Sequence, residues 1–182
     1  MTSADDVVRR TLAAAPTLGA GRLVCVDGPS GSGKTTFGAD VRRAVPGEVS
    51  CRVVHLDDLY PGWDGLSAGV EHVAEHVVAA FERGEDGRYR RYDWHTGQPG
   101  GWVDVPRVDL LVLDGVGSGA LAYADLVTTL VWLEAGDDVR LARGVARDGV
   151  ASREHLVRWM AAEAPYLLEQ RTRDRADFVI RT

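Results

Sequence analysis

The segment best suited to chemistry is a glycine-rich stretch that reads Gly28-Pro29-Ser30-Gly31-Ser32-Gly33-Lys34-Thr35. It matches the pattern G-x-x-x-x-G-K-[ST], whose glycines let successive backbone N–H groups surround an anion. A helix that begins directly after the stretch would point its positive N-terminal end at the same anion. The Lys34 side chain can reach the terminal phosphates of a nucleoside triphosphate, and the Thr35 hydroxyl can bind Mg²⁺. The stretch therefore predicts a binding site for ATP and Mg²⁺.

Lysine usage separates this stretch from the rest of the chain. Lys34 is the only lysine among the 21 lysine and arginine residues. The alternative is a glycine-rich turn that merely caps a helix, and such a turn gives no reason for a solitary lysine. The residues predicted to hold the nucleotide phosphates are Gly28, Ser30, Gly31, Ser32, Gly33, Lys34, Thr35 and Thr36.

An acidic residue ends a second apolar run. Asp114 follows the run 110–113 (LLVL) and precedes Gly115. A carboxylate at the end of a buried strand is costly without a cationic partner, and in a phosphate site it can orient Mg²⁺ through the water shell of the ion. We therefore predict Thr35 and Asp114 as the metal-site residues. The alternative is an aspartate that only begins a turn with Gly115.

Two further acids close the apolar run 51–56. Asp57 and Asp58 open a loop that holds Tyr60, Trp63 and Asp64, at the strand end where ligands bind in open α/β sheets. A carboxylate there can accept the proton of a reacting hydroxyl. Because successive residues of an extended segment point opposite ways, only one of the pair can face the phosphates, and we assign Asp57. An Asp pair that only caps a turn is the alternative.

Three arginines lie on one stripe of a predicted helix. Arg140, Arg143 and Arg147 are spaced i, i+3 and i+7, so their like charges repel unless an anion lies between them. We predict that the stripe closes over a polyphosphate, with Arg140 and Arg143 stabilising the transferred charge and Arg147 contacting the nucleotide. A solvated arginine face is the alternative.

The segment 88–95 (RYRRYDWH) mixes cations with aromatic rings, which suits stacking on a base or sugar, or binding of a phosphate. An amphipathic strand is the alternative.

Residues 72–76 spell H-x-x-E-H, a pattern also found in one class of zinc peptidases. A peptidase site and a phosphate site would compete for one small domain, so zinc is the lesser hypothesis.

Apolar runs of strand length alternate with helical patterns along the chain, which predicts a three-layer α/β fold with a parallel sheet covered by helices on both faces. Residues 88–93 and 102–105 predict a small hairpin excursion at about 88–105. The predicted strands are 22–27, 51–56, 110–113, 127–133 and 178–180, and the predicted helices are 5–15, 34–45, 68–83, 138–147 and 153–171.

Composition limits the partners of the protein. A chain of 182 residues that is 45% hydrophobic suits one domain, and a net charge of −6 disfavours nucleic acid and anionic membranes as partners. Cys25 and Cys51 lie in apolar runs, which predicts buried thiols in a reducing compartment. The N-terminal residues lack a signal-peptide pattern, and no run of apolar residues is long enough to span a bilayer. We therefore expect a soluble cytoplasmic protein.

Together these segments resemble the uridine/cytidine kinase group of P-loop kinases. Besides the glycine-rich stretch, the likeness rests on HLDDLY at 55–60, YDW at 92–94, VLDG at 112–115, R-x-x-R-x-x-x-R-D at 140–148 and TRDRADFVI at 172–180. It implies a five-stranded sheet of order 2-3-1-4-5 and a lid at about 140–152. It departs from the family at Asp114, where the family usually has Glu, and in a shorter loop after Tyr60.

The resemblance implies transfer of the γ-phosphoryl of ATP to a small-molecule hydroxyl, most simply the 5′-hydroxyl of uridine or cytidine, with Asp57 as base. Two alternatives stay open: a nucleotide kinase whose phosphate acceptor is held by Arg88, Arg90 and Arg91, and a regulatory ATP-binding module without kinase activity. The oligomeric state is left open, with a homo-oligomer as one option. The residues implied on the acceptor side are Asp57, Tyr60, Trp63, Asp64, Tyr92, Asp93, Trp94 and His95.

Overall fold

The computed structural model describes residues 2–182. Its main sheet has five parallel strands in the order β2-β5-β1-β6-β7. Counted within this sheet alone, the order is 2-3-1-4-5, so the predicted architecture and sheet order are confirmed. The strands are β1 (Arg22–Asp27), β2 (Cys51–His55), β5 (Leu110–Asp114), β6 (Thr129–Glu134) and β7 (Phe178–Arg181).

Alternate residues of the central strands face two separate hydrophobic layers. In β1, Leu23 and Cys25 enter one layer, whereas Val24 and Val26 enter the other. This period of two follows from strand geometry, and strands buried on both faces read as unbroken apolar runs. The runs in the sequence therefore predicted the strands well.

Helices α1 (Ala4–Ala13) and α2 (Lys34–Ala44) cover one face of the sheet. The Ser3 side chain caps the start of α1 and exchanges hydrogen bonds with Asp6, which stabilises the first turn. Three segments that run on without a break, α3 (Leu66–Val73), a π-helical turn (Ala74–Val78) and α4 (Ala79–Glu82), pack on the other face.

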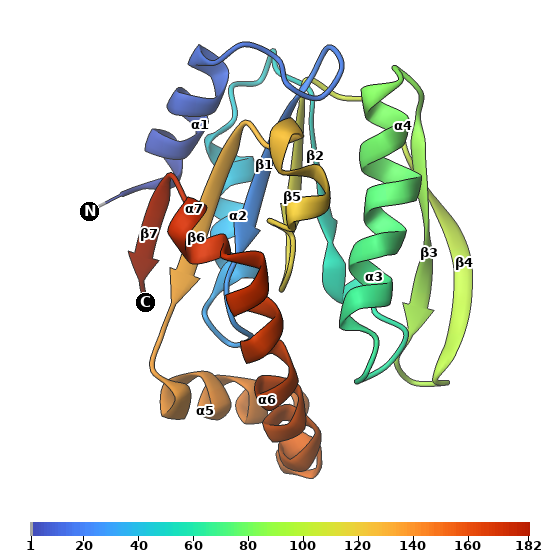
Figure 1. Cartoon of the computed structure of the whole chain (residues 1–182), viewed down its shortest axis with the longest axis vertical. Coiled ribbons are helices and arrows are strands. Elements are labelled where there is room, and N and C mark those ends of the chain that lie inside the picture. Colours follow the sequence, from blue (N-terminus) through green and yellow to red (C-terminus); the bar gives the residue numbers. More distant parts are fainter. Residues whose placement is uncertain (1) are drawn as a thin grey trace.

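A two-stranded antiparallel hairpin, β3 (Gly87–Asp93) and β4 (Gln98–Val105), lies outside the main sheet beside α3 and α4 (Figure 1). The sequence predicted this hairpin, although β4 begins four residues earlier than expected because Gln98 and Pro99 pair with Asp93 and Tyr92 of β3.

The C-terminal ends of the parallel strands point toward α5 (Asp137–Asp148) and the start of α6 (Arg153–Gln170), which project below the sheet in Figure 1. A short helix, α7 (Thr172–Arg175), joins α6 to β7 and was not predicted. Within residues 2–182, no helix combines the length and apolar character needed to cross a bilayer.

Candidate active site

The glycine-rich stretch forms a loop between the end of β1 and the start of α2, as the motif requires. Gly28 and Gly31 have φ angles of 137° and 77°, in the region that L side chains rarely adopt. A Cβ atom at Gly28 would lie 2.1 Å from the Leu133 carbonyl oxygen, and one at Gly31 would lie 2.5 Å from the Arg140 carbonyl oxygen. Both the backbone conformation and the close packing therefore require glycine.

Lys34 is buried at the first turn of α2, where its Nζ donates a hydrogen bond of 2.9 Å to the Pro29 carbonyl oxygen. Burial lowers the pKa of Lys34, and nearby carboxylates oppose that shift. The carboxylates that act on it belong to Asp57, Glu163, Asp27 and Asp114. One cation thus lies among four acids, an arrangement that favours an anion accompanied by a metal cation over a bare anion.

The predicted metal residues lie together. Thr35 Oγ1 donates to Asp114 Oδ1 at 3.3 Å, and Asp114 is almost fully buried. Asp114 Oδ2 lies 2.7 Å from His55 Nδ1, a contact that raises the pKa of His55 and that the sequence did not suggest. A hydroxyl and a carboxylate oxygen at the phosphate loop fit the oxygen ligands that Mg²⁺ prefers.

Asp57 is open to solvent on one side, while the protein around its other sides raises its pKa. The positive charges of Lys34 and Arg147 oppose this rise, and both residues therefore act on the Asp57 carboxylate. Asp58 points elsewhere and accepts a hydrogen bond of 3.2 Å from Arg91 Nε. The structure thus places the two neighbouring acids in different surroundings, with Asp57 on the side of the phosphate loop.

The three arginines of α5 have three different environments. Arg140 is buried and ion-paired, Arg143 donates to the Gly31 carbonyl oxygen at 3.3 Å, and Arg147 pairs with Asp148 at 2.7 Å. Arg140 and Arg143 both contact the phosphate loop, but only Arg140 is buried, because it also pairs with Glu163 of α6. Arg147 remains exposed near Asp57.

The aromatic residues predicted on the acceptor side form a cluster that we call the aromatic cluster: Trp63, Tyr92 and Trp94. The Trp94 ring centroid lies 5.2 Å from those of Trp63 and Tyr92, both at edge-to-face angles. Trp94 Nε1 donates to the Asp57 backbone oxygen at 2.9 Å, which attaches the cluster to the segment of the predicted base.

Other predicted acceptor residues lie apart from the cluster. Tyr60 is buried in the core, where its hydroxyl donates to the Val116 carbonyl oxygen at 2.7 Å, so its ring offers no open surface. Asp93 accepts the backbone N–H groups of His95 and Thr96 and thereby caps the hairpin turn. Asp64 and His95 are exposed side chains.

The H-x-x-E-H segment gains no support as a zinc site. His72 Nε2 accepts the Arg90 backbone N–H at 2.9 Å, and the rings of His72 and His76 pack against Trp102. Across residues 2–182, no group of three or more His, Cys, Asp or Glu side chains is placed to hold a metal ion.

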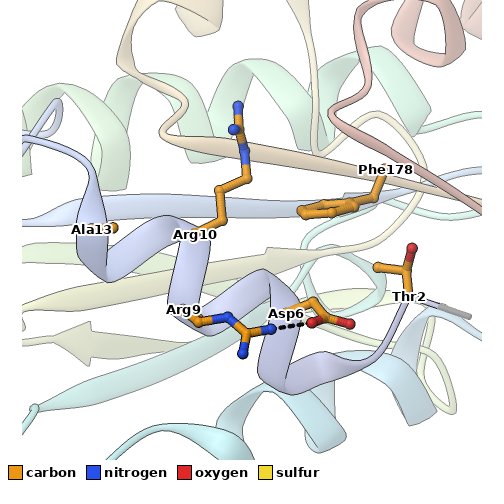
Figure 2. Close-up of a pocket in the computed structure, with 6 residues that line it drawn as sticks. All are labelled: Thr2, Asp6, Arg9, Arg10, Ala13 and Phe178. Atoms are coloured by element: carbon orange, nitrogen blue, oxygen red, sulfur yellow. Dashed lines mark hydrogen bonds and ion pairs between the residues drawn. The ribbon is translucent and has the colours of Figure 1, made fainter.

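Two surface hollows lie beside β7, the edge strand of the main sheet. The larger, of about 540 Å³, is lined by Thr2, Asp6, Arg9, Arg10, Ala13 and Phe178, none of which was predicted for the site (Figure 2). The smaller, of about 480 Å³, is lined by Glu134, Ala135, Gly136, Arg181 and Thr182. Thr182 Oγ1 donates to the Ser32 carbonyl oxygen at 3.0 Å, so the smaller hollow adjoins the phosphate loop.

Sequence reasoning missed two buried carboxylates beside the phosphate loop, Asp27 and Glu163. Asp27 accepts the backbone N–H groups of Gly28, Gly117 and Gly119 at 2.7, 2.8 and 2.9 Å. Burial raises the pKa of Asp27, and these three hydrogen bonds oppose the rise. Like Asp114, Asp27 ends an apolar strand, and that position in the sequence could have marked it as a site residue. Glu163 lies inside a helix, where no local pattern marked it.

Replacing Asp27 with asparagine is expected to destabilise the fold by about 1–3 kcal/mol, because the new amide group would face the Gly119 N–H and leave that buried donor unpaired. Urea unfolding would show a lower midpoint with an unchanged slope. The exposed Asp40→Asn serves as the matched control and should change stability by less than about 1 kcal/mol. Equal stability of Asp27→Asn and the native chain would contradict this account.

The sheet order, the glycine-rich loop between β1 and α2 and the helices on both faces define a P-loop NTPase fold of the kinase-like kind. A structure described as a possible uridine kinase from Bacillus stearothermophilus is similar, with a TM-score of 0.70 at 21% identity over 97% of each chain. A putative fructose transport system kinase from Silicibacter sp. TM1040 has a TM-score of 0.62 at 18% identity, over 99% of this chain and 100% of the other. No family model and no curated protein matches the sequence.

Proposed function

We infer that the protein is an ATP-dependent kinase that transfers the γ-phosphoryl group to a hydroxyl of a small molecule. The observation that carries this proposal is the placement of Asp57. Its carboxylate is open to solvent, interacts with the charge of Lys34 in the phosphate loop, and belongs to the segment that Trp94 contacts. A phosphate site, a candidate base and an aromatic cluster thus meet at one edge of the sheet.

The residues divide the work of phosphoryl transfer between them. The loop N–H groups and the α2 N-terminus bind the phosphates, and Lys34 draws charge toward the β- and γ-phosphoryl oxygens. Mg²⁺, held by Thr35 with Asp114, would neutralise charge on the phosphates. Asp57 accepts the proton of the acceptor hydroxyl as the new O–P bond forms and ADP leaves. Arg147 and Arg143 lie near enough to the loop and Asp57 to bind developing negative charge.

For the acceptor we propose a nucleoside such as uridine or cytidine. The aromatic cluster offers rings for a base, and stacking of this kind contributes about 1–3 kcal/mol per base. The description of one similar structure as a possible uridine kinase agrees with this choice, while the other is described as a putative fructose transport system kinase. Sugars therefore belong in the same test.

The two free thiols, Cys25 and Cys51, suit a reducing cytoplasm as the place of the reaction.

The phosphate-acceptor alternative has weaker support. Arg88 lies over the Trp102 ring at 4.6 Å, Arg90 donates to the Gly100 carbonyl oxygen, and Arg91 pairs with Asp58. Because these arginines have separate partners, they do not converge on one anion. A regulatory module would in turn leave the open carboxylate of Asp57 without a role.

An acceptor screen tests the proposal directly. The chain is incubated with ATP and Mg²⁺ and with nucleosides, nucleotides, sugars or vitamin precursors, and ADP release is measured. We expect uridine or cytidine at millimolar concentration to stimulate ADP release well above the rate with water alone. Stimulation by a different alcohol would retain the kinase and refute the nucleoside assignment. A screen in which no acceptor stimulates ADP release would refute the kinase.

A further inference from the structure

One face of α6 touches both halves of the proposed site. His155, Trp159 and Glu163 are spaced i, i+4 and i+8, so they lie in a single row along the helix, which we call the α6 row. In Figure 1 this helix runs from the region below the sheet up to its edge. The row therefore spans the distance between the acceptor loop and the phosphate loop on one continuous element.

The first part of the α6 row packs on the acceptor side. The His155 ring stacks on Trp63 with centroids 5.2 Å apart and planes 12° apart. The buried Trp159 ring lies 6.3 Å from the Trp63 centroid and 5.1 Å from the Tyr60 centroid. Two consecutive turns of α6 thus contact Trp63 of the aromatic cluster.

The last member of the row binds the phosphate loop. Both carboxylate oxygens of Glu163 accept the Ser30 backbone N–H, at 3.1 and 3.0 Å, and Oε1 also accepts the Ser30 hydroxyl at 3.0 Å. Glu163 is only 1% exposed. Arg140 Nη1 lies 2.9 Å from Oε1 and donates to the Ser30 carbonyl oxygen at 3.1 Å. A single residue of the phosphate loop is therefore held on three of its polar atoms.

The contacts of Glu163 exceed what packing alone requires. A buried carboxylate is costly unless a cation and hydrogen bonds satisfy it, and apolar residues of similar volume often stabilise a core as well or better. The charge instead gives a directional attachment to Ser30. Because His155, Trp159 and Glu163 lie on one helix, before Pro165, a shift of the loop on nucleotide binding would displace Trp159 and His155 along with Glu163.

We propose that Glu163 is a positioning residue which, through the α6 row, couples occupancy of the phosphate loop to the arrangement of the aromatic cluster. The inference rests on the proposed function only in that the loop must bind a nucleotide. It assigns to α6 the task of placing the acceptor relative to the phosphates, and it gives the chain a means to favour acceptor binding after ATP has bound.

Tryptophan emission reports on the surroundings of the α6 row and the aromatic cluster. If Glu163 only stabilised the fold, its replacement would leave the emission response to nucleotide unchanged. AMP-PNP with Mg²⁺ serves as the probe, and its binding is measured in parallel by calorimetry. We expect binding to change the emission of the native chain, the Trp159→Phe variant to lose most of that change, and Trp102→Phe, on the outer hairpin, to retain it. Glu163→Gln is expected to bind the probe within about tenfold of the native affinity while losing most of the emission change.

The outcomes separate the two proposals. If the native chain does not bind AMP-PNP, the proposed function fails and the coupling fails with it. If AMP-PNP binds without an emission change, or if Glu163→Gln keeps the full change, the coupling alone is refuted. Should Glu163→Gln not fold, the double variant Arg140→Met with Glu163→Met removes the buried charges as a pair. It is expected to bind the probe and to lose the emission change, and retention of the change would refute the proposal.

Discussion

Replacement of Lys34 by alanine is expected to lower the rate of phosphoryl transfer by about 10²–10³-fold, because the loss of one donor aimed at developing negative charge costs about this much. Lys34 is the only lysine of the chain, and four carboxylates act on its pKa. Without it, those carboxylates would repel the incoming phosphates. Acceptor-dependent ADP release at saturating ATP measures the effect.

The control for Lys34→Ala is Arg43→Ala, which removes a cation from the exposed side of the same helix. This variant is expected to retain native turnover. Circular dichroism should show that Lys34→Ala keeps the native secondary structure, since the α2 N-terminus does not depend on the lysine side chain. A Lys34→Ala variant with near-native turnover would refute the assignment of the glycine-rich loop as the site of phosphoryl transfer.

Asp57→Asn is expected to lower turnover by about 10²–10⁴, the usual contribution of a positioned general base, while ATP affinity stays close to native. The carboxylate must be ionised to accept a proton, so activity should fall as the pH drops through its pKa. Because the surrounding protein raises the pKa of Asp57, this loss should begin at higher pH than for an ordinary aspartate. Rate profiles against pH measure it, and Asp57→Asn should lack this acid limb.

Asp58→Asn is the matched control for Asp57→Asn, because it changes the neighbouring acid, which pairs with Arg91 away from the loop. It should keep the native rate and the native acid limb. If Asp58→Asn loses activity and Asp57→Asn does not, the choice between the two carboxylates is wrong.

The elements of the fold could be predicted because each carries a strong local signal. Strands buried on both faces read as apolar runs, and the glycine-rich loop fixes where β1 ends and α2 begins. The bounds of β4 were harder to predict, since its pairing with β3 decides them. The helix α7 was harder to predict because it is only four residues long. The order of the sheet came from resemblance, because no single run of residues encodes which strands lie side by side.

The site was only partly predictable from the sequence. Spacing on a helix treated Arg140, Arg143 and Arg147 as equivalent, yet the contact of one turn of α5 with Ser30 buries the first of them. The position of Tyr60 after the acidic pair suggested an open ring, but tertiary packing against Trp159 placed it in the core. Such outcomes depend on elements distant in sequence, which no local pattern describes.

The two hydrophobic layers of the sheet have unequal consequences for mutational tolerance. The layer that contains Tyr60 and Trp159 adjoins the proposed acceptor side, whereas the layer that contains Val7, Val8 and Val41 lies under α1 and α2. Substitutions in the first layer would alter selectivity along with stability. Directed evolution toward a new acceptor would therefore select substitutions in the first layer. Compensating substitutions that raise the melting temperature would come from the part of the second layer under α1.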